Sequence, residues 1–361
     1  MPNGARGGSP VATGAEQIFG DLRAIAARVR ADLEAEIAES SLELPADVAP
    51  AAEISRFARD ERARVLEAGV SGLEKLAAHR EDEIDEAESF GVEAIVLLQG
   101  RPAILVQRQD FAPQRDEWAV LDGQRAAIRE SLSRVGRVEV TGHPSLDWIG
   151  TAFLVGPRTV MTNRHVAAEF SRFEADRDRW TFEFGMSARV DPAEELPVED
   201  DPVAAASSTP YEITEIIGIH PDVDMALLRI EPSASDGLPT PLAVAADAPA
   251  SVPGRPVYVV GYPAWDGRRN EPESMRRIFM DVYNVKRLQP GAATEFTPGS
   301  LVMKHDCSTL GGNSGSPVLD LADHRVLGLH FGGRYRSGNL AVPLWELVDD
   351  PLLARAEVNW V

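Results

Sequence analysis

Ser314 lies in a glycine-rich stretch, GGNSGSP, at residues 311–317. Glycines permit a tight turn whose backbone N–H groups point outward together, and such a turn leaves its central side chain exposed and fixed. An attacking hydroxyl needs this setting. An ordinary surface loop would also explain the string, so other residues must decide whether Ser314 is a nucleophile.

A serine hydroxyl is a weak nucleophile and requires a nearby base, which in turn needs a group to orient it. Among the seven histidines, His165 in TVMTNRHVAAEF follows a strand-like run and precedes a short helical turn, although a histidine there could be purely structural. Asp224 in HPDVDMALLRI is the preferred orienting carboxylate, because it directly precedes a strand of buried type. Asp222, nearer solvent, is the alternative.

Three stretches of the chain resemble the sequence boxes of the trypsin-like serine proteases. TNRHVAA resembles their histidine box, DMALLRI their aspartate segment and GGNSGSPV their serine box, in the same chain order. The resemblance covers roughly residues 136–361. It implies two six-stranded antiparallel β-barrels with the catalytic groups in the cleft between them, closed by a C-terminal helix near residues 344–353.

The resemblance also implies a role for each residue. Ser314 would attack the scissile carbonyl, His165 would take and return its proton, and Asp224 would orient and support the imidazolium. The backbone N–H groups of Gly312 and Ser314 would form the oxyanion hole, where charge develops only in the transition state. Asn313 stands where the digestive enzymes carry an aspartate that pairs with a newly freed N-terminus, so activation by that route is not expected.

The serine box is most similar to that of the glutamyl endopeptidases, and more loosely to that of the high-temperature-requirement proteases. In the first group a threonine and a histidine recognise an acidic side chain before the cut, and Thr309 and His330 occupy matching places here. Ser308 stands where a trypsin-like pocket would need an aspartate. We therefore predict that Ser308, Thr309 and His330 line the substrate pocket and favour an acidic residue. The alternative is a structural His330 and a pocket for small or uncharged residues.

The composition limits the remaining classes of function. With 361 residues and 44% hydrophobic content, the chain can build a sizeable core. Its formal net charge of -21 disfavours binding to nucleic acids and anionic membranes. The sequence contains no long apolar run, and because its first residues lack a hydrophobic core we expect no signal sequence. Its single cysteine, Cys307, allows no internal disulfide. We expect a cytoplasmic protein that needs no cofactor or metal.

The sequence changes character twice along the chain. Residues 1–14 are predicted to be disordered, and apolar residues recur every three or four positions in residues 15–90, which favours a helical hairpin. Residues 91–135 form a connecting segment with short strands and a helix. Short β-branched and aromatic runs separated by Gly and Pro in residues 136–361 indicate a mostly β sandwich or barrel, and the resemblance implies that this domain is the double barrel. Within it, the acidic segment 191–210 is expected to be a solvated loop.

The main interpretation is a serine endopeptidase that cuts polypeptides through an acyl-enzyme intermediate. The alternative is an inactive protease-like module that binds peptides in the cleft as an adaptor. An esterase or lipase predicts the chain order Ser, Asp, His, which this sequence lacks. The N-terminal helices could brace the barrels, mediate self-association or adaptor binding, or cover the active site.

Overall fold

The computed structural model describes most of the chain from residue 101 onward and isolated positions before it. The described residues are 101–196, 210–232, 237–264, 279, 282–334 and 338–361, with residues 27, 30, 67, 68, 70, 71, 74 and 75. The chain forms two compact units, one made of residues 1–100 with 276–278 and the other of the remaining residues.

In the first unit, every described position is helical. Arg30 Nη2 lies 2.8 Å from Glu74 Oε1, so an ion pair joins the two stretches that the sequence predicts as a hairpin. The predicted disordered N-terminus, most of the hairpin and the start of the connecting segment, residues 91–100, lie outside the described residues. The domain boundaries proposed from the sequence stay predictions.

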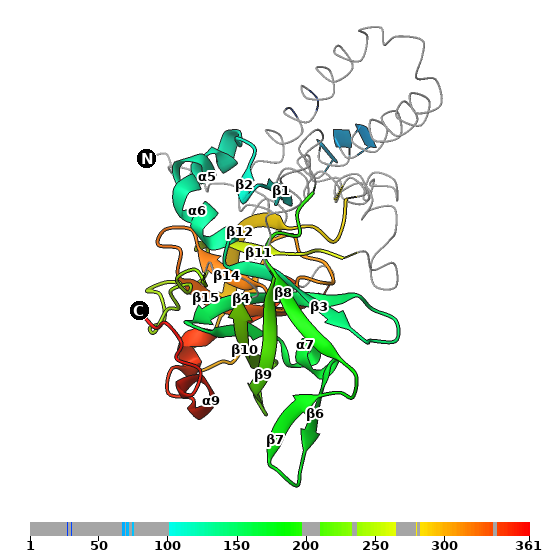
Figure 1. Ribbon diagram of the computed structural model, residues 1–361. Coiled ribbons are helices and arrows are strands. Elements are labelled where there is room, and N and C mark those ends of the chain that lie inside the picture. Colours follow the sequence, from blue (N-terminus) through cyan, green and yellow to red (C-terminus); the bar gives the residue numbers. More distant parts are fainter. Residues whose placement is uncertain are drawn as a thin grey trace, which may run out of the picture. The chain divides into compact units, whose positions relative to one another are not determined.

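The first barrel of the second unit is closed and antiparallel, with the strand order β10-β5-β4-β3-β8-β9. Small and β-branched side chains such as Val138, Val160 and Ile230 fill its interior. A short helix and a hairpin, β6 with β7, are inserted between β5 and β8, and the hairpin projects from the barrel in Figure 1. The elements are β3 (Val135–Thr141), β4 (Trp148–Gly156), β5 (Thr159–Thr162), α7 (Arg164–Ala168), β6 (Ser171–Glu174), β7 (Arg179–Phe182), β8 (Ser187–Asp191), β9 (Tyr211–Ile219) and β10 (Ala226–Pro232).

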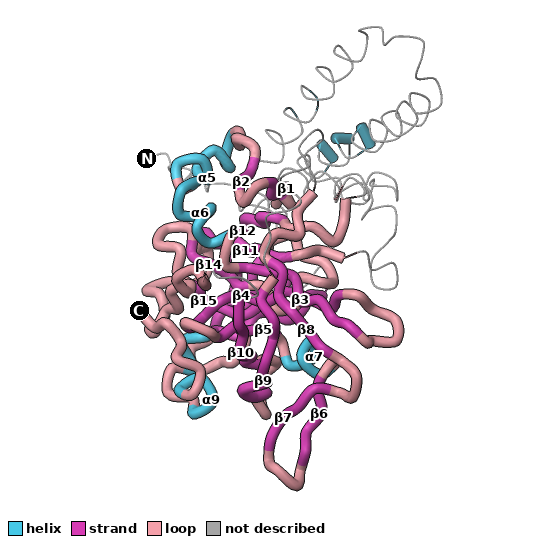
Figure 2. The backbone as a smooth tube through the Cα atoms, viewed as in Figure 1, coloured by secondary structure: helices cyan, strands magenta, loops and turns pink. Residues whose placement is uncertain are grey.

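The second barrel has the strand order β11-β14-β15-β16-β13-β12, and pairing of β11 with β12 closes it. The predicted fold class, mostly β with two six-stranded antiparallel barrels, is therefore confirmed. Figure 2 shows that strands far exceed helices in the described part of the second unit. The strands are β11 (Pro256–Gly261), β12 (Arg287–Phe296), β13 (Met303–His305), β14 (Pro317–Asp320), β15 (Val326–Arg334) and β16 (Gly338–Pro343).

The largest hydrophobic cluster joins the two barrels. It packs Phe153 and Met161 of the first barrel with Val260 and Leu329 of the second, all of them buried. Burying one such side chain stabilises the fold by roughly 1.5–3 kcal/mol. This shared core fixes how the two barrels face each other, which decides where residues from each can meet.

The connecting segment is part of the second barrel's sheet, which the sequence did not predict. Strand β1 pairs antiparallel with β12, Ile104 opposite Leu288. The Tyr258 hydroxyl of β11 donates to Ser131 Oγ of helix α6 over 3.0 Å. The strand and the helix expected here are observed as β1 (Ile104–Gln107) and α6 (Arg125–Leu132), with β2 (Asp110–Phe111), η4 (Asp116–Ala119) and α5 (Val120–Gly123) between them.

Two expectations need correction. The single C-terminal helix is instead a 3₁₀ turn, η6 (Leu344–Leu347), followed by the short helix α9 (Pro351–Ala354). Proline cannot continue a helix from the preceding turn, and Asp350 caps a new one by accepting from the Leu352 N–H over 2.8 Å.

The start of the acidic segment is anchored to the fold, whereas a solvated loop was expected. The fully buried Lys286 ammonium donates to the Pro192 carbonyl, and the Lys286 N–H donates to the Glu194 carbonyl over 3.0 Å. Residues 197–209 lie outside the described residues. Among the described residues, no helix has the length and apolar character required to cross a bilayer.

Candidate active site

His165 and Asp224 are joined by two hydrogen bonds. His165 Nδ1 lies 2.7 Å from Asp224 Oδ2, and the His165 N–H donates to Asp224 Oδ1 over 3.0 Å. His165 lies near the start of α7, directly after β5, and its side chain is 51% exposed, whereas that of Asp224 is 27% exposed. The contact thus fixes both the ring and the main chain of His165 and leaves half of the ring open.

The residues beside His165 hold the turn that carries Asp224. Asn163 Nδ2 donates to the Asp224 carbonyl over 2.8 Å, and Arg164 Nη1 donates to the Pro221 carbonyl over 2.9 Å. Strand β10 begins two residues after Asp224 and pairs with β5. The alternative carboxylate, Asp222, is exposed and, among the described residues, forms no hydrogen bond or ion pair with His165.

His220 organises the same turn from inside. Its Nδ1 accepts from the N–H groups of Asp222 and Val223, each over 3.1 Å, and its Nε2 lies 3.1 Å from Asp350 Oδ2. Because Nδ1 accepts two bonds, the ring proton sits on Nε2 and points to Asp350. His220 is not among the residues predicted for the site, and its position at the start of the HPDVD turn was the available signal.

The environment of Asp224 keeps it ionised. Burial alone would raise the pKa of Asp224, but the hydrogen bonds from the His165 side chain and backbone, together with the attraction of His165 and Arg164, lower it overall. A carboxylate at this position stabilises an imidazolium that forms when His165 accepts a proton.

Residues of both barrels form hydrogen bonds with the turn that carries Ser314. Thr151 of β4 donates its N–H to the Ser314 carbonyl over 2.8 Å, and Gly315 donates its N–H to the His330 carbonyl of β15 over 3.0 Å. Gly312 and Gly315 have φ angles of +83° and +90°, which favour glycine. A side chain at position 312 would lie 2.6 Å from the ring of Trp148.

Among the residues that the structure describes, two backbone N–H groups of this turn have no hydrogen-bond acceptor. Within the described residues, neither the Gly312 nor the Ser314 N–H donates a hydrogen bond, while Asn313 between them donates to the Leu310 carbonyl over 3.2 Å. The neighbouring amides are therefore left for an external acceptor. Backbone donors of this kind suit an oxygen that gains negative charge during a reaction.

The serine turn and helix α7 meet at Gly150 of β4. A Cβ atom at Gly150 would lie 2.8 Å from Val166 Cγ2, next to His165, and 3.0 Å from the Ser314 carbonyl oxygen. In the described part of the chain, the Ser314 hydroxyl makes no hydrogen bond with the His165 ring. Such bonds are often long in ligand-free sites and tighten when substrate binds.

The three predicted pocket residues differ in what their side chains contact. The Ser308 hydroxyl donates to the Arg101 carbonyl over 2.5 Å, so it is already engaged. Thr309 is half-buried. His330 is 2% exposed, and its Nδ1 lies 3.1 Å from Nε2 of His305, a fully buried residue that the sequence analysis did not select.

The buried histidine pair is neutral. Burial lowers the pKa of His305 to about 3. Burial, with the nearby rings of His305 and His165, lowers the pKa of His330 well below its usual range. Each neutral ring carries one N–H. One of the two N–H groups can therefore donate to the other ring, and the second remains available to donate to another partner.

Comparisons with known proteins identify a peptidase domain in the chain and several similar solved structures. A profile of the trypsin-like peptidase domain matches residues 150–329, whereas a search of curated proteins found no match. The Rv3671c protease from M. tuberculosis, active form, is 19% identical over 71% of this chain and 91% of its own, with a TM-score of 0.42. Its inactive form is 21% identical over 67% and 96%, with a TM-score of 0.40.

A Glu endopeptidase in complex with MPD is 16% identical over 63% of this chain and 91% of its own, with a TM-score of 0.42. The matched domain contains all three residues of the candidate site, His165, Asp224 and Ser314. On the strength of the domain match and the paired six-stranded barrels, the chain belongs to the trypsin-like peptidase family.

Proposed function

We propose that this protein is a serine endopeptidase in which Ser314 is the nucleophile, His165 the general base and Asp224 the orienting carboxylate. The observation that carries the proposal is the 2.7 Å contact between His165 Nδ1 and Asp224 Oδ2. It fixes the proton of the neutral ring on Nδ1 and leaves Nε2 as the basic nitrogen. A base held in this tautomer can accept a hydroxyl proton.

The reaction follows from these roles. Ser314 Oγ attacks the peptide carbonyl carbon while its proton moves to His165 Nε2, and the carbonyl oxygen takes the negative charge. The N–H groups of Gly312 and Ser314 hydrogen-bond that oxygen. The carbon–nitrogen bond then breaks as His165 gives its proton to the leaving amine, and water releases the acyl group by the same steps with His165 again as base.

Acidic specificity is the finer part of the proposal. Among the described residues, no group hydrogen-bonds to the buried Nδ1 atom of His305. An unpaired buried N–H costs more than an unpaired ring nitrogen, so we place the His305 proton on Nε2, where it donates to His330 Nδ1. His330 then carries its own proton on Nε2. This N–H and the Thr309 hydroxyl would donate to a substrate carboxylate.

A peptide library tests both parts. Peptides that differ only in Glu, Asp, Ala, Leu or Arg before the cut are incubated with the parental protein and with Ser314→Ala. We expect cleavage by the parental protein, fastest after Glu or Asp, and none by the variant. Dominant cutting after Arg would contradict the acidic pocket, and binding without cleavage would favour the alternative, an inactive peptide-binding module.

The remaining proposals concern the cellular location of the protein and its binding partners. The composition and the single cysteine support a cytoplasmic location. The apolar stripes of residues 15–90 support self-association or adaptor binding through the N-terminal helices. A polypeptide is the expected substrate, and the proposed chemistry requires no cofactor.

A further inference from the structure

One residue from the connecting segment contacts both sides of Cys307. The Arg101 guanidinium donates to Asp306 through Nε to Oδ1 over 2.7 Å and through Nη2 to Oδ2 over 2.6 Å. The Arg101 carbonyl accepts from Ser308 Oγ over 2.5 Å. Arg101 therefore holds positions 306 and 308, immediately before Thr309 in the proposed substrate pocket.

The contact between Arg101 and Asp306 is of the strong kind. It is bidentate and charge-assisted, and both side chains are mostly buried, at 24% and 22% exposed. Burial alone would lower the pKa of Arg101, but the hydrogen bonds and charge of Asp306 raise it overall. The guanidinium also lies over the ring of Trp118, 5.7 Å from its centroid.

The pocket segment has little secondary structure of its own. Strand β13 ends at His305, and residues 306–310 are neither helix nor strand. Other side chains complete its support: Gln289 Nε2 donates to the Ser308 carbonyl over 2.6 Å, and Asn339 Nδ2 donates to the Cys307 carbonyl over 2.5 Å. Arg101 supplies three of the contacts that hold this segment, two through its guanidinium and one through its carbonyl.

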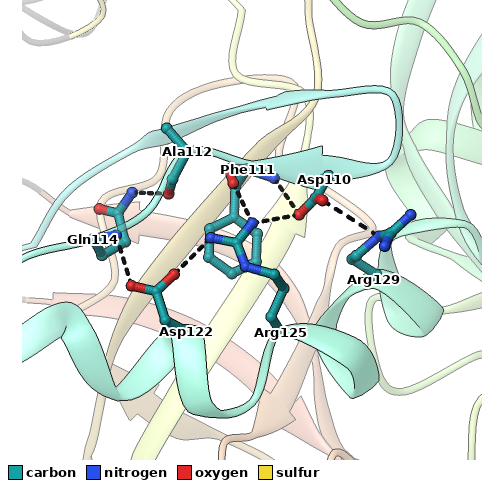
Figure 3. Close-up of polar contacts among 7 residues, drawn as sticks. All are labelled: Asp110, Phe111, Ala112, Gln114, Asp122, Arg125 and Arg129. Carbon is teal, nitrogen blue, oxygen red and sulfur yellow. Dashed lines mark hydrogen bonds and ion pairs between the residues drawn. The ribbon is translucent and has the colours of Figure 1, made fainter.

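An ordered element presents Arg101 to the pocket. Arg287 Nη1 of β12 donates to the Ala103 carbonyl over 2.8 Å, next to the pairing of β1 with β12. Figure 3 shows how Arg125 of α6 holds β2, the strand that follows β1. Arg125 donates to Asp110 of β2 and to Asp122 of α5, each over 2.6 Å. The segment before the first barrel is thus held by several hydrogen bonds to the second barrel's sheet and within itself.

We propose that Arg101 is a positioning residue for the substrate pocket, so that the segment before the first barrel belongs to the substrate-binding machinery. The inference rests on the proposed endopeptidase function for its kinetic consequences. Arg101 touches neither the triad nor the substrate directly; it acts through Asp306 and Ser308. Its loss should therefore weaken substrate selection more than the reactivity of Ser314.

The test compares Arg101→Ala, Arg101→Lys and Ser308→Ala with Arg325→Ala in the full chain. Arg325 pairs with Asp323 over 2.8 Å on the same barrel, away from the pocket segment, and serves as the matched control. For Arg101→Ala we expect kcat/KM on the preferred peptide to fall by about tenfold, mainly through KM, with reduced discrimination between peptides. Arg101→Lys and Ser308→Ala should show smaller losses, and Arg325→Ala none.

Two further readouts isolate the positioning role. The rate at which a small fluorophosphonate labels Ser314 should stay within about twofold of the parental rate, because this probe does not need the pocket. Hydrogen–deuterium exchange at residues 306–312 should accelerate in Arg101→Ala but not in Arg325→Ala. Exchange reports on the pocket segment whether or not the protein is an enzyme.

The outcomes separate the two proposals. A parental protein that neither cuts peptides nor reacts with the probe would overturn the proposed function, while exchange would still decide the role of Arg101. Unchanged exchange together with unchanged KM in Arg101→Ala would overturn the inference. Equal loss of peptide cleavage and of probe labelling would also overturn it, because the effect would then not be confined to the pocket. If Arg101→Ala does not fold, Arg101→Lys and Ser308→Ala give the same comparison.

Discussion

His165 binds both carboxylate oxygens of Asp224, one through its ring and one through its main chain. The two bonds lock the position and the tautomer of the ring together. A change at Asp224 should therefore alter the chemistry of His165 without unfolding the protein.

Asp224→Asn should lower kcat by about four orders of magnitude, because an amide N–H facing Nδ1 would favour the opposite tautomer of the ring. The matched control is Asp222→Asn, two residues away on the same turn, which should keep parental activity. Both variants should melt near the parental temperature. Equal activity losses in the two variants would contradict the assignment of Asp224.

The serine turn should tolerate no side chain at Gly315. A Cβ atom there would overlap the Thr151 carbonyl and lie 2.5 Å from Thr162 Oγ1. Gly254 has a similar φ of +80°, but a Cβ atom there would meet open space. Gly254→Ala therefore introduces the same backbone strain without the steric overlap, and it serves as the control. We expect Gly315→Ala to be less stable than Gly254→Ala by about 1–3 kcal/mol in denaturant unfolding. Equal stability of the two variants would show that the turn can accommodate a Cβ atom at position 315, contrary to the structure.

The His305 ring should make stability depend on pH. Its pKa is about 3 in the folded protein, whereas an unfolded histidine titrates near 6.5, at about its ordinary value. Between these values only the unfolded chain binds the proton, so the free energy of unfolding should decrease as pH falls below about 6.5, by up to about 1.4 kcal/mol per pH unit.

Urea unfolding from pH 7 to pH 4.5 measures this slope. His305→Leu removes the titrating ring at similar volume and should make the dependence shallower by about one proton. An identical slope in the two proteins would mean that His305 does not stay neutral in the folded state.

The same pair should govern substrate choice. In His330→Leu, kcat/KM for a peptide with Glu before the cut should fall by about 100-fold, while that for the matched Gln peptide should fall much less, because one charge-assisted bond is lost. Thr309→Val should act in the same direction. Parallel losses on both peptides would indicate a structural His330, the alternative that the sequence left open.

Local signals allowed much of the site to be predicted from the sequence. His165, Asp224 and the glycine turn around Ser314 each lie in a short stretch with a recognisable pattern, and short β-branched and aromatic runs between Gly and Pro indicated a sandwich or barrel. The break at Pro351 was also visible as an Asp-Pro pair, but the resemblance to the trypsin-like serine proteases implied one helix.

The contacts that could not be predicted join residues far apart in the chain. Arg101 and Asp306 are separated by 205 positions, and neither lies in a motif. His305 and His330 meet because β13 and β15 both pair with β16, a register that depends on barrel closure. The burial of Lys286 against Pro192 likewise depends on how the connecting segment packs, which composition alone does not reveal.

The most direct test of the account is the site and extent of labelling by a fluorophosphonate probe, measured by mass spectrometry of the intact protein and its peptides. The account predicts one label per parental molecule, located on Ser314, and almost none on folded Ser314→Ala or His165→Ala. A folded Ser314→Ala protein that is labelled as fast as the parental one would contradict it.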